Sequence, residues 1–179
     1  MLFGPFNHAL SAMIAMCNRK NTPYTDNLNR LADVIAAIQV MGTYKFYKLD
    51  FDGWADRIGG DETKGQYWKT IFEQHPEFFR LDSGRKRASL VWRRNYQKLY
   101  HVDREEKISR EEYKSLSDDE KARVSRNPLT NSDISTLVNT AINLHSREIE
   151  NKKDSRWWIS GAIGLLGVIL GAVIKAIAG

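Results

Sequence analysis

Apolar residues recur every three or four positions in several stretches of the chain, which is the spacing of one face of an α-helix. Residues 6–20 predict a first helix, followed by the turn-forming sequence NTPYTDN. The next stretch predicts a second helix with Thr25 or Asp26 as its N-cap. The apolar face of this second helix consists of Leu28, Leu31, Val34, Ile35 and Ile38.

The pattern then changes to alternation and back to helical spacing. TYKFYKLDF predicts a short strand, and DGWADRIGG predicts a short helix that ends at Gly59 and Gly60. A further helix is expected over 61–74. Two β-favouring runs, EFFRLD and RASLVWRR, flank SGRK and predict a hairpin. The expected order is therefore helix, strand, helix, helix, hairpin.

This order, with a tight glycine turn between the second and third helices, resembles the winged helix, a helix-turn-helix variant that ends in a β-hairpin wing. The resemblance covers residues 26–96 and rests on element order. It implies that 61–74 is the recognition helix and that 80–94 is the wing, with 83–87 at its tip. The helix over 61–74 carries three acidic and two basic residues, so it is not basic.

A charged segment and an amphipathic segment follow the predicted hairpin. Residues 102–127 are densely charged and contain helix-start signals at Ser109 and Ser117, which predicts a solvated helical connector. After Pro128 an apolar stripe predicts a helix capped near Asn131 or Ser132, which either packs on the domain or pairs with a copy of itself. The stripe consists of Ile134, Leu137, Val138, Ala141, Leu144 and Ile149.

Residues 157–174 contain no charged side chain and predict a membrane-spanning helix. At 1.5 Å per residue this stretch covers about 27 Å, close to the hydrocarbon thickness of a bilayer. Trp157 and Trp158 fit one membrane interface and Lys175 the other, and the preceding basic residues favour a cytoplasmic N-terminal domain. Because few residues follow Lys175, we expect a tail anchor. A stripe of small residues predicts self-association of this helix: Ser160, Gly164, Gly167 and Gly171.

The net charge of +5 is concentrated in one place, because residues 80–98 hold seven basic residues and one acidic residue. Such a patch indicates an acidic partner: nucleic acid, an acidic groove on a protein, or anionic lipid. An ordinary solvated sheet face, with Phe79 and Trp92 turned to the core, explains the same pattern. The candidate partner-binding residues are Arg80, Arg85, Lys86, Arg87, Arg93 and Arg94.

The sequence offers no catalytic constellation. The four histidines are scattered, and the single cysteine, Cys17, excludes an intrachain disulfide and a cysteine-based zinc site. No phosphate-cradling glycine loop is present either. We therefore expect no enzyme activity, no cofactor and no metal.

The predicted fold class is mainly α with a small β-hairpin, a helical stalk and one C-terminal transmembrane helix. The expected segments are an N-terminal helix (1–23), a winged-helix-like domain (24–101), a charged connector (102–127), an amphipathic stalk (128–156) and a transmembrane helix (157–179). In layout alone this resembles single-pass membrane effectors of prokaryotic antiphage systems, which implies a homo-oligomer that disrupts membranes. The alternatives are a membrane-tethered DNA-binding regulator and an adaptor that brings a cytosolic protein to the membrane.

Overall fold

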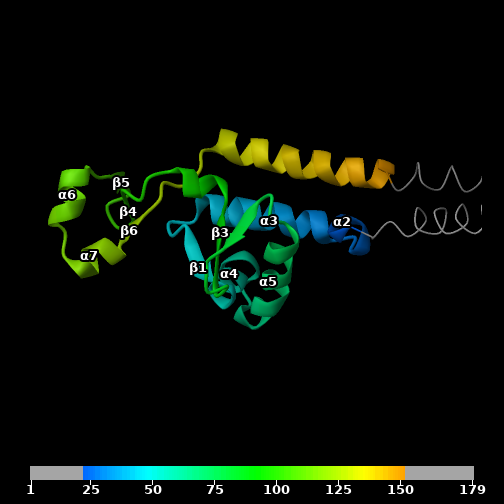
Figure 1. The fold of residues 1–179 in the computed structure, drawn as a ribbon, viewed down its shortest axis with the longest axis horizontal. Coiled ribbons are helices and arrows are strands. Elements are labelled where there is room, and N and C mark those ends of the chain that lie inside the picture. Colours follow the sequence, from blue (N-terminus) through cyan, green and yellow to red (C-terminus); the bar gives the residue numbers. More distant parts are fainter. Residues whose placement is uncertain (1–21, 152–179) are drawn as a thin grey trace, which may run out of the picture. The chain divides into compact units, whose positions relative to one another are not determined.

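The computed structural model describes residues 22–151 (Figure 1), and these divide into two units. One unit is Asn27–Asn143, and the described parts of the other are 22–26 and 144–151. The helix predicted over 6–20 and the membrane helix predicted over 157–179 lie outside the described residues. No helix within 22–151 is long and apolar enough to cross a membrane.

The larger unit is mainly helical and contains two small three-stranded antiparallel sheets. Its first part has the predicted order of helix, strand, helix, helix and hairpin. The elements are α3 (Arg30–Thr43), β1 (Lys48–Asp50), α4 (Phe51–Gly59), the 3₁₀ turn η1 (Glu62–Lys64), α5 (Gly65–Gln74), β2 (Phe79–Leu81) and β3 (Arg87–Leu90).

Helix α3 forms the centre of this unit. Val34, Ala37, Ile38 and Met41 are fully buried, and their spacing of three and four residues places them on one helical face. The predicted cap at Thr25 or Asp26 is wrong, because Asn29 occupies the N-cap position and Leu28 is fully exposed. The chain at Pro23–Asp26 instead forms the short helix α2 of the other unit.

Helix α4 begins and ends as its sequence predicts. Asp50 caps it by accepting a hydrogen bond from the Gly53 backbone N–H at 2.9 Å. Gly60 follows with a φ of 70°, a left-handed conformation that glycine adopts without strain. Trp54 of α4 is fully buried with Ile71 and Phe72 of α5, so the two helices share one core.

The first sheet has the strand order β1-β3-β2. In its register Leu49 and Leu81 both lie opposite Ala88. Ala88 is fully buried, and its carbonyl oxygen accepts a hydrogen bond from Trp54 Nε1 at 2.9 Å. This row therefore faces α4. Strand β3 ends at Leu90, earlier than the predicted run to residue 94, and the 3₁₀ turn η2 (Trp92–Asn95) follows it.

The charged segment after the hairpin is not the helical connector that the sequence predicts. It contains β4 (Tyr100–His101), β5 (Glu106–Lys107), α6 (Arg110–Ser115), α7 (Asp118–Ala122) and β6 (Val124–Ser125), and its sheet order is β5-β4-β6. The segment has a core of Leu99, Ile108, Leu116 and Val124, with Tyr113 packed against it. The predicted helix starts are confirmed, because Ser109 caps α6 and Ser117 forms a capping box with Glu120.

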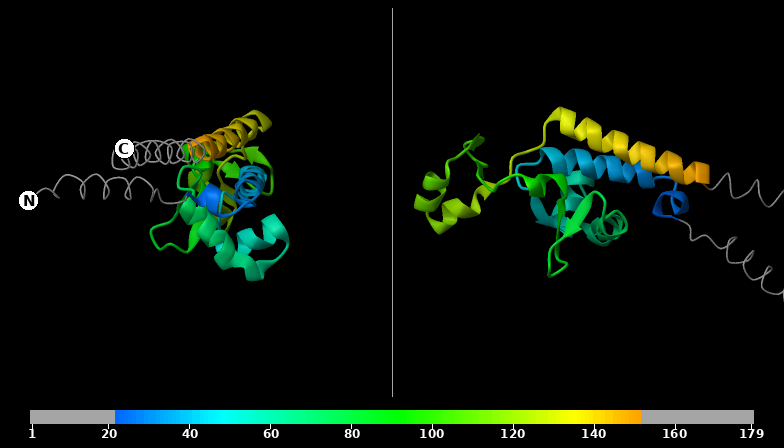
Figure 2. Two further views of the ribbon diagram at one scale, coloured as in Figure 1. Left: turned by 90° about the vertical axis from the view of Figure 1, so that its right-hand side faces the viewer. Right: turned by 45° about the horizontal axis from the view of Figure 1, so that its top comes forward.

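The predicted stalk is helical over 131–151, the last described residue. Its cap is Thr130, whose Oγ1 accepts from the Asp133 backbone N–H at 3.2 Å, rather than Asn131 or Ser132. Leu137 and Ala141 are buried, and Ile134 approaches Gly42 so closely that a Cβ there would lie 3.2 Å from Ile134 Cγ1. Up to residue 143 the apolar stripe therefore packs on α3. Figure 2 shows this part of the stalk helix running beside α3.

Within the described residues, the smaller unit consists of the segment with α2 and the part of the stalk helix beyond residue 143. The rings of Tyr24 and His145 meet edge to face with centroids 5.6 Å apart. Such aromatic pairs contribute about 0.5–1.5 kcal/mol beyond the area that they bury.

Candidate anion-binding face

The outer face of the first sheet carries a row of polar side chains across all three strands. The register sets Lys48 of β1 and Arg80 of β2 on either side of Ser89 of β3. Residues that lie opposite one another in an antiparallel pair point to the same face of a sheet. Ser89 is 1% exposed and its hydroxyl donates to the Arg80 carbonyl oxygen at 3.3 Å. The row thus places one cation on each side of a small hydroxyl group.

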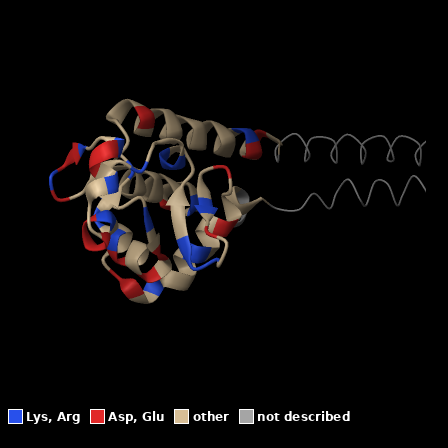
Figure 3. Cartoon of the chain, turned by 60° about the vertical axis from the view of Figure 1, so that its left-hand side comes forward, with Lys and Arg blue, Asp and Glu red and all other residues tan. Residues whose placement is uncertain are grey.

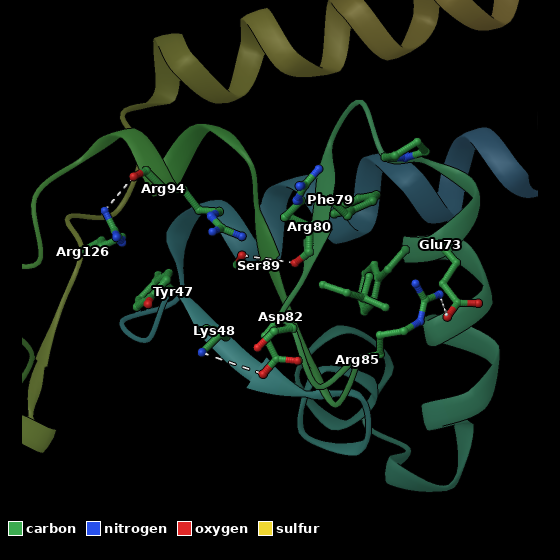
Figure 4. A pocket seen from close by; sticks show the side chains of 14 residues that line it. Tyr47, Lys48, Glu73, Phe79, Arg80, Asp82, Arg85, Ser89, Arg94 and Arg126 are labelled. Carbon is green, nitrogen blue, oxygen red and sulfur yellow. Dashed lines mark hydrogen bonds and ion pairs between the residues drawn. The ribbon is translucent and has the colours of Figure 1, made fainter.

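Two further arginines reach this face from outside the strands. Arg94 comes from η2, and Arg126 follows β6 of the second sheet. Arg126 Nη1 donates to the Arg94 carbonyl oxygen at 2.7 Å and also to the Tyr96 carbonyl oxygen. Its guanidinium carbon lies 4.9 Å from the centre of the Tyr47 ring. These contacts hold the Arg126 guanidinium beside Arg94 at one end of the sheet (Figure 4).

The hairpin turn lies at the other end. Asp82 Oδ1 accepts from the backbone N–H groups of Lys86 at 2.9 Å and Arg87 at 3.2 Å. These hydrogen bonds, with a smaller contribution from Lys48, hold the pKa of Asp82 below its ordinary value. Arg85 has a φ of 51° and donates to Glu73 Oε1 of α5 at 2.7 Å. The ionised carboxylate of Asp82 therefore stabilises the turn, and Arg85 forms an ion pair with Glu73 of α5.

Together these groups line an open hollow of about 750 Å³ over the sheet (Figure 4). Its lining contains five basic and two acidic side chains, a net charge of +3. The basic residues are Lys48, Arg80, Arg85, Arg94 and Arg126, and the acidic residues are Glu73 and Asp82.

Three of the five cations have no carboxylate partner among the described residues. Arg85 pairs with Glu73, and Lys48 Nζ lies 4.0 Å from Asp82 Oδ2. Arg80, Arg94 and Arg126 form no ion pair within 22–151. Cations held on one concave surface without counter-charges raise the local positive potential. The hollow is therefore suited to an anionic ligand.

Arg93, one of the candidate partner-binding cations, is buried instead. It is fully inaccessible, and its guanidinium donates to five backbone carbonyl oxygens. These belong to Met41, Tyr44, Lys45, Arg126 and Asn127. Burial lowers the pKa of Arg93 to about 10, so the side chain stays protonated at neutral pH. Arg93 joins three chain segments and is unavailable to a partner.

The remaining candidates of the hairpin are exposed. Arg80, Lys86, Arg87 and Arg94 face solvent, with Lys86 and Arg87 near the turn and outside the lining of the hollow. The predicted membrane residues lie outside the described part of the chain: Trp157, Trp158, Ser160, Gly164, Gly167, Gly171 and Lys175.

Helix α5, which the winged-helix resemblance makes the recognition helix, presents mixed charge. Lys64 pairs with Asp61 at 3.3 Å, and Lys69 lies over the Phe51 ring at 5.7 Å. Tyr67 donates to Asp33 Oδ2 at 2.6 Å, and burial together with this carboxylate raises the pKa of Tyr67. Figure 3 shows acidic and basic residues interspersed on this unit. The basic surface is therefore on the sheet rather than on α5.

Sequence reasoning missed Lys48, Ser89 and Arg126 as members of this face. The register of β1 against β3 creates the row, and no local pattern in the sequence encodes that register. Arg126 lies 32 residues beyond Arg94 in the chain, and the second sheet brings it back. Within 22–151 no group of three or more His, Cys, Asp or Glu residues is arranged to hold a metal ion.

Comparison with known proteins gave no match: no family model, no curated protein and no solved structure matches this chain. The function is therefore inferred from the chain's own residues.

Proposed function

We propose that this chain is a non-enzymatic, single-pass membrane protein whose domain binds an anionic partner on the cytoplasmic side. The partner lies against the outer face of the first sheet, while the membrane helix over 157–174 associates with copies of itself. The observation that carries the proposal is the group of unpaired arginines, Arg80, Arg94 and Arg126, around one hollow. A surface kept this basic without internal neutralisation is suited to an acidic partner.

The domain is winged-helix-like in this proposal. Support comes from the order of its elements and from the strand order β1-β3-β2, in which the strand before α4 pairs with the second strand of the hairpin. The partner surface is nevertheless centred on the sheet, because α5 carries acidic and basic residues together and contributes only Phe72 and Glu73 to the hollow.

The membrane part of the proposal rests on the sequence. Small residues at Gly164, Gly167 and Gly171 let helix backbones approach closely in lipid. A partner-binding domain joined to such a helix suits a defence effector that disrupts the membrane once it assembles.

A membrane-tethered DNA-binding regulator is the second candidate. The exposed Lys86 and Arg87 favour it, because they lie at the hairpin turn, where a wing contacts the duplex backbone. This function requires α5 to enter the major groove. The ion pairs of Lys64 with Asp61 and of Arg85 with Glu73 argue against such an entry, because they neutralise basic side chains near α5. A membrane adaptor for a cytosolic protein is the remaining alternative.

The proposed face is tested by chromatography of the full-length protein on heparin in a neutral detergent. We expect Arg80→Ala/Arg94→Ala to elute at clearly lower salt than the wild type, because each arginine removed from the hollow loses a phosphate-like or sulfate contact. Lys64→Ala/Lys69→Ala removes the same net charge from the α5 side and is expected to elute with the wild type. A shift of the α5 variant alone would move the partner surface to the helices and contradict the proposal.

A further inference from the structure

We infer that the anionic partner is single-stranded nucleic acid, held by its phosphates in the hollow over the first sheet. This inference rests on the proposed anionic partner and gives it a chemical class. It also places the nucleic acid on the sheet face that carries Lys48, Ser89 and Arg80, where α5 contributes only Phe72 and Glu73 to the lining. The duplex-reading geometry of a winged helix is therefore not used.

The type of cation is the first argument. Four of the five basic residues that line the hollow are arginines, and three of these have no carboxylate partner within the described residues. A guanidinium presents a planar fork of N–H donors that matches two phosphate oxygens at once. Arg80 and Arg94, both exposed, are free to form such contacts along a phosphate chain.

The guanidinium of Arg126 is held in place by its neighbours. It lies over the Tyr47 ring and is held by the carbonyl oxygens of Arg94 and Tyr96. Unpaired bases stack on arginine planes and aromatic rings in single-strand binding proteins, and the inference places a base against this half-buried Arg126–Tyr47 pair. The hollow thus combines phosphate contacts with one stacking position.

The volume of the hollow and the burial of its apolar lining favour a single strand over a protein partner. The lining contains the apolar residues Phe72, Pro76, Phe79 and Leu81, of which only Pro76 is exposed. None of the large hydrophobic residues exposed within the described chain lines the hollow: Leu28, Tyr67, Tyr96, Ile142 and Ile149. Protein partners usually need such apolar anchors at the centre of an interface. A volume of about 750 Å³ accommodates a few nucleotides of a flexible strand.

The test is a fluorescence anisotropy titration of the full-length protein in neutral detergent. The probe is a fluorescein-labelled single-stranded DNA of mixed sequence and about 16 nucleotides. The two phosphate contacts of Arg80 and Arg94 predict that log K falls with log salt with a slope of about −1.4. We expect Arg80→Ala/Arg94→Ala to weaken binding at least about tenfold and to reduce the slope by about 1.4.

The matched control is Lys86→Ala/Arg87→Ala, which removes the same charge from the hairpin turn. We expect this variant to bind within about twofold of the wild type, since neither side chain lines the hollow. An equal or larger loss in the control would place the site at the turn and overturn the inference. A duplex of the same sequence that binds more tightly than the single strand would also overturn it.

A poly-glutamate peptide and heparin separate the inference from the proposed function. Binding of both without binding of the oligonucleotide would leave an anionic protein partner and reject nucleic acid. Failure of heparin, peptide and oligonucleotide alike at low salt would reject the anion-binding face itself.

Discussion

Replacing Arg93 with alanine is expected to lower the free energy of unfolding by about 3–5 kcal/mol. Arg93 is fully buried, and its five N–H donors contact the carbonyl oxygens of residues 41, 44, 45, 126 and 127. An alanine would leave these acceptors without their donor and would open a cavity. Buried carbonyl groups without partners carry a desolvation penalty of about 1–3 kcal/mol each before the structure relaxes.

The matched control for Arg93 is its exposed neighbour Arg94. Arg94→Ala removes the same side chain from the surface and is expected to change the free energy of unfolding by less than about 0.5 kcal/mol. Arg93→Lys keeps the charge, but a single ammonium cannot reach five separated acceptors, so most of the loss should remain. Urea denaturation of the full-length chain measures all three variants. Equal stability of Arg93→Ala and Arg94→Ala would contradict the role assigned to Arg93.

Arg93 also links stability to the candidate site. Its contacts to the carbonyl oxygens of Lys45 and Arg126 join the segment before β1 to the segment after β6. The Tyr47 ring and the Arg126 guanidinium, which stack at one end of the hollow, lie within two residues of these contacts. A folded Arg93 variant should therefore bind an anionic probe more weakly, although Arg93 itself does not line the hollow.

Replacing Trp54 with alanine is expected to lower the free energy of unfolding by about 3–5 kcal/mol as well. Trp54 is fully buried between α4 and the inner face of the first sheet. Its Nε1 donates to the Ala88 carbonyl oxygen at 2.9 Å, and its ring meets that of Tyr44 edge to face at 5.9 Å. Alanine would lose this hydrogen bond and leave a large cavity behind the strand that carries Ser89.

Trp54→Phe separates packing from hydrogen bonding in the same position. Phenylalanine keeps most of the apolar volume but has no N–H donor, so we expect a smaller loss of about 1–3 kcal/mol. The measurement is the urea midpoint of the full-length chain followed by circular dichroism. If Trp54→Ala unfolded at the wild-type urea concentration, the packing of α4 against the sheet would be wrong.

The elements that the sequence predicted are those with strong local signals. The fully buried positions of α3 repeat at helical spacing, Gly60 ends α4 in the left-handed conformation, and Ser109 and Ser117 cap α6 and α7. Each of these signals depends on residues within one turn of one another. Local chemistry is therefore sufficient to place them.

The features that the sequence did not predict depend on contacts between distant residues. The strands β4, β5 and β6 have two residues each, too few for an alternating pattern, and their sheet exists because residues 100–101 pair with 106–107 and 124–125. Arg93 lies within a run of basic residues and looks like a surface cation. Its burial is decided by carbonyl groups more than 30 residues away in the chain. The same reason kept Arg126 out of the predicted site.

The central claim, a partner-binding domain on a self-associating membrane helix, is tested most directly by the size and mass of the full-length protein in detergent. The comparison is a chain that ends at Asn151. We expect a large assembly for the full-length protein and a monomer for the shorter chain, because Gly164, Gly167 and Gly171 lie beyond residue 151. Replacing these three glycines with leucine should also reduce the assembly to monomers. A monomer for the unchanged full-length protein would contradict the account.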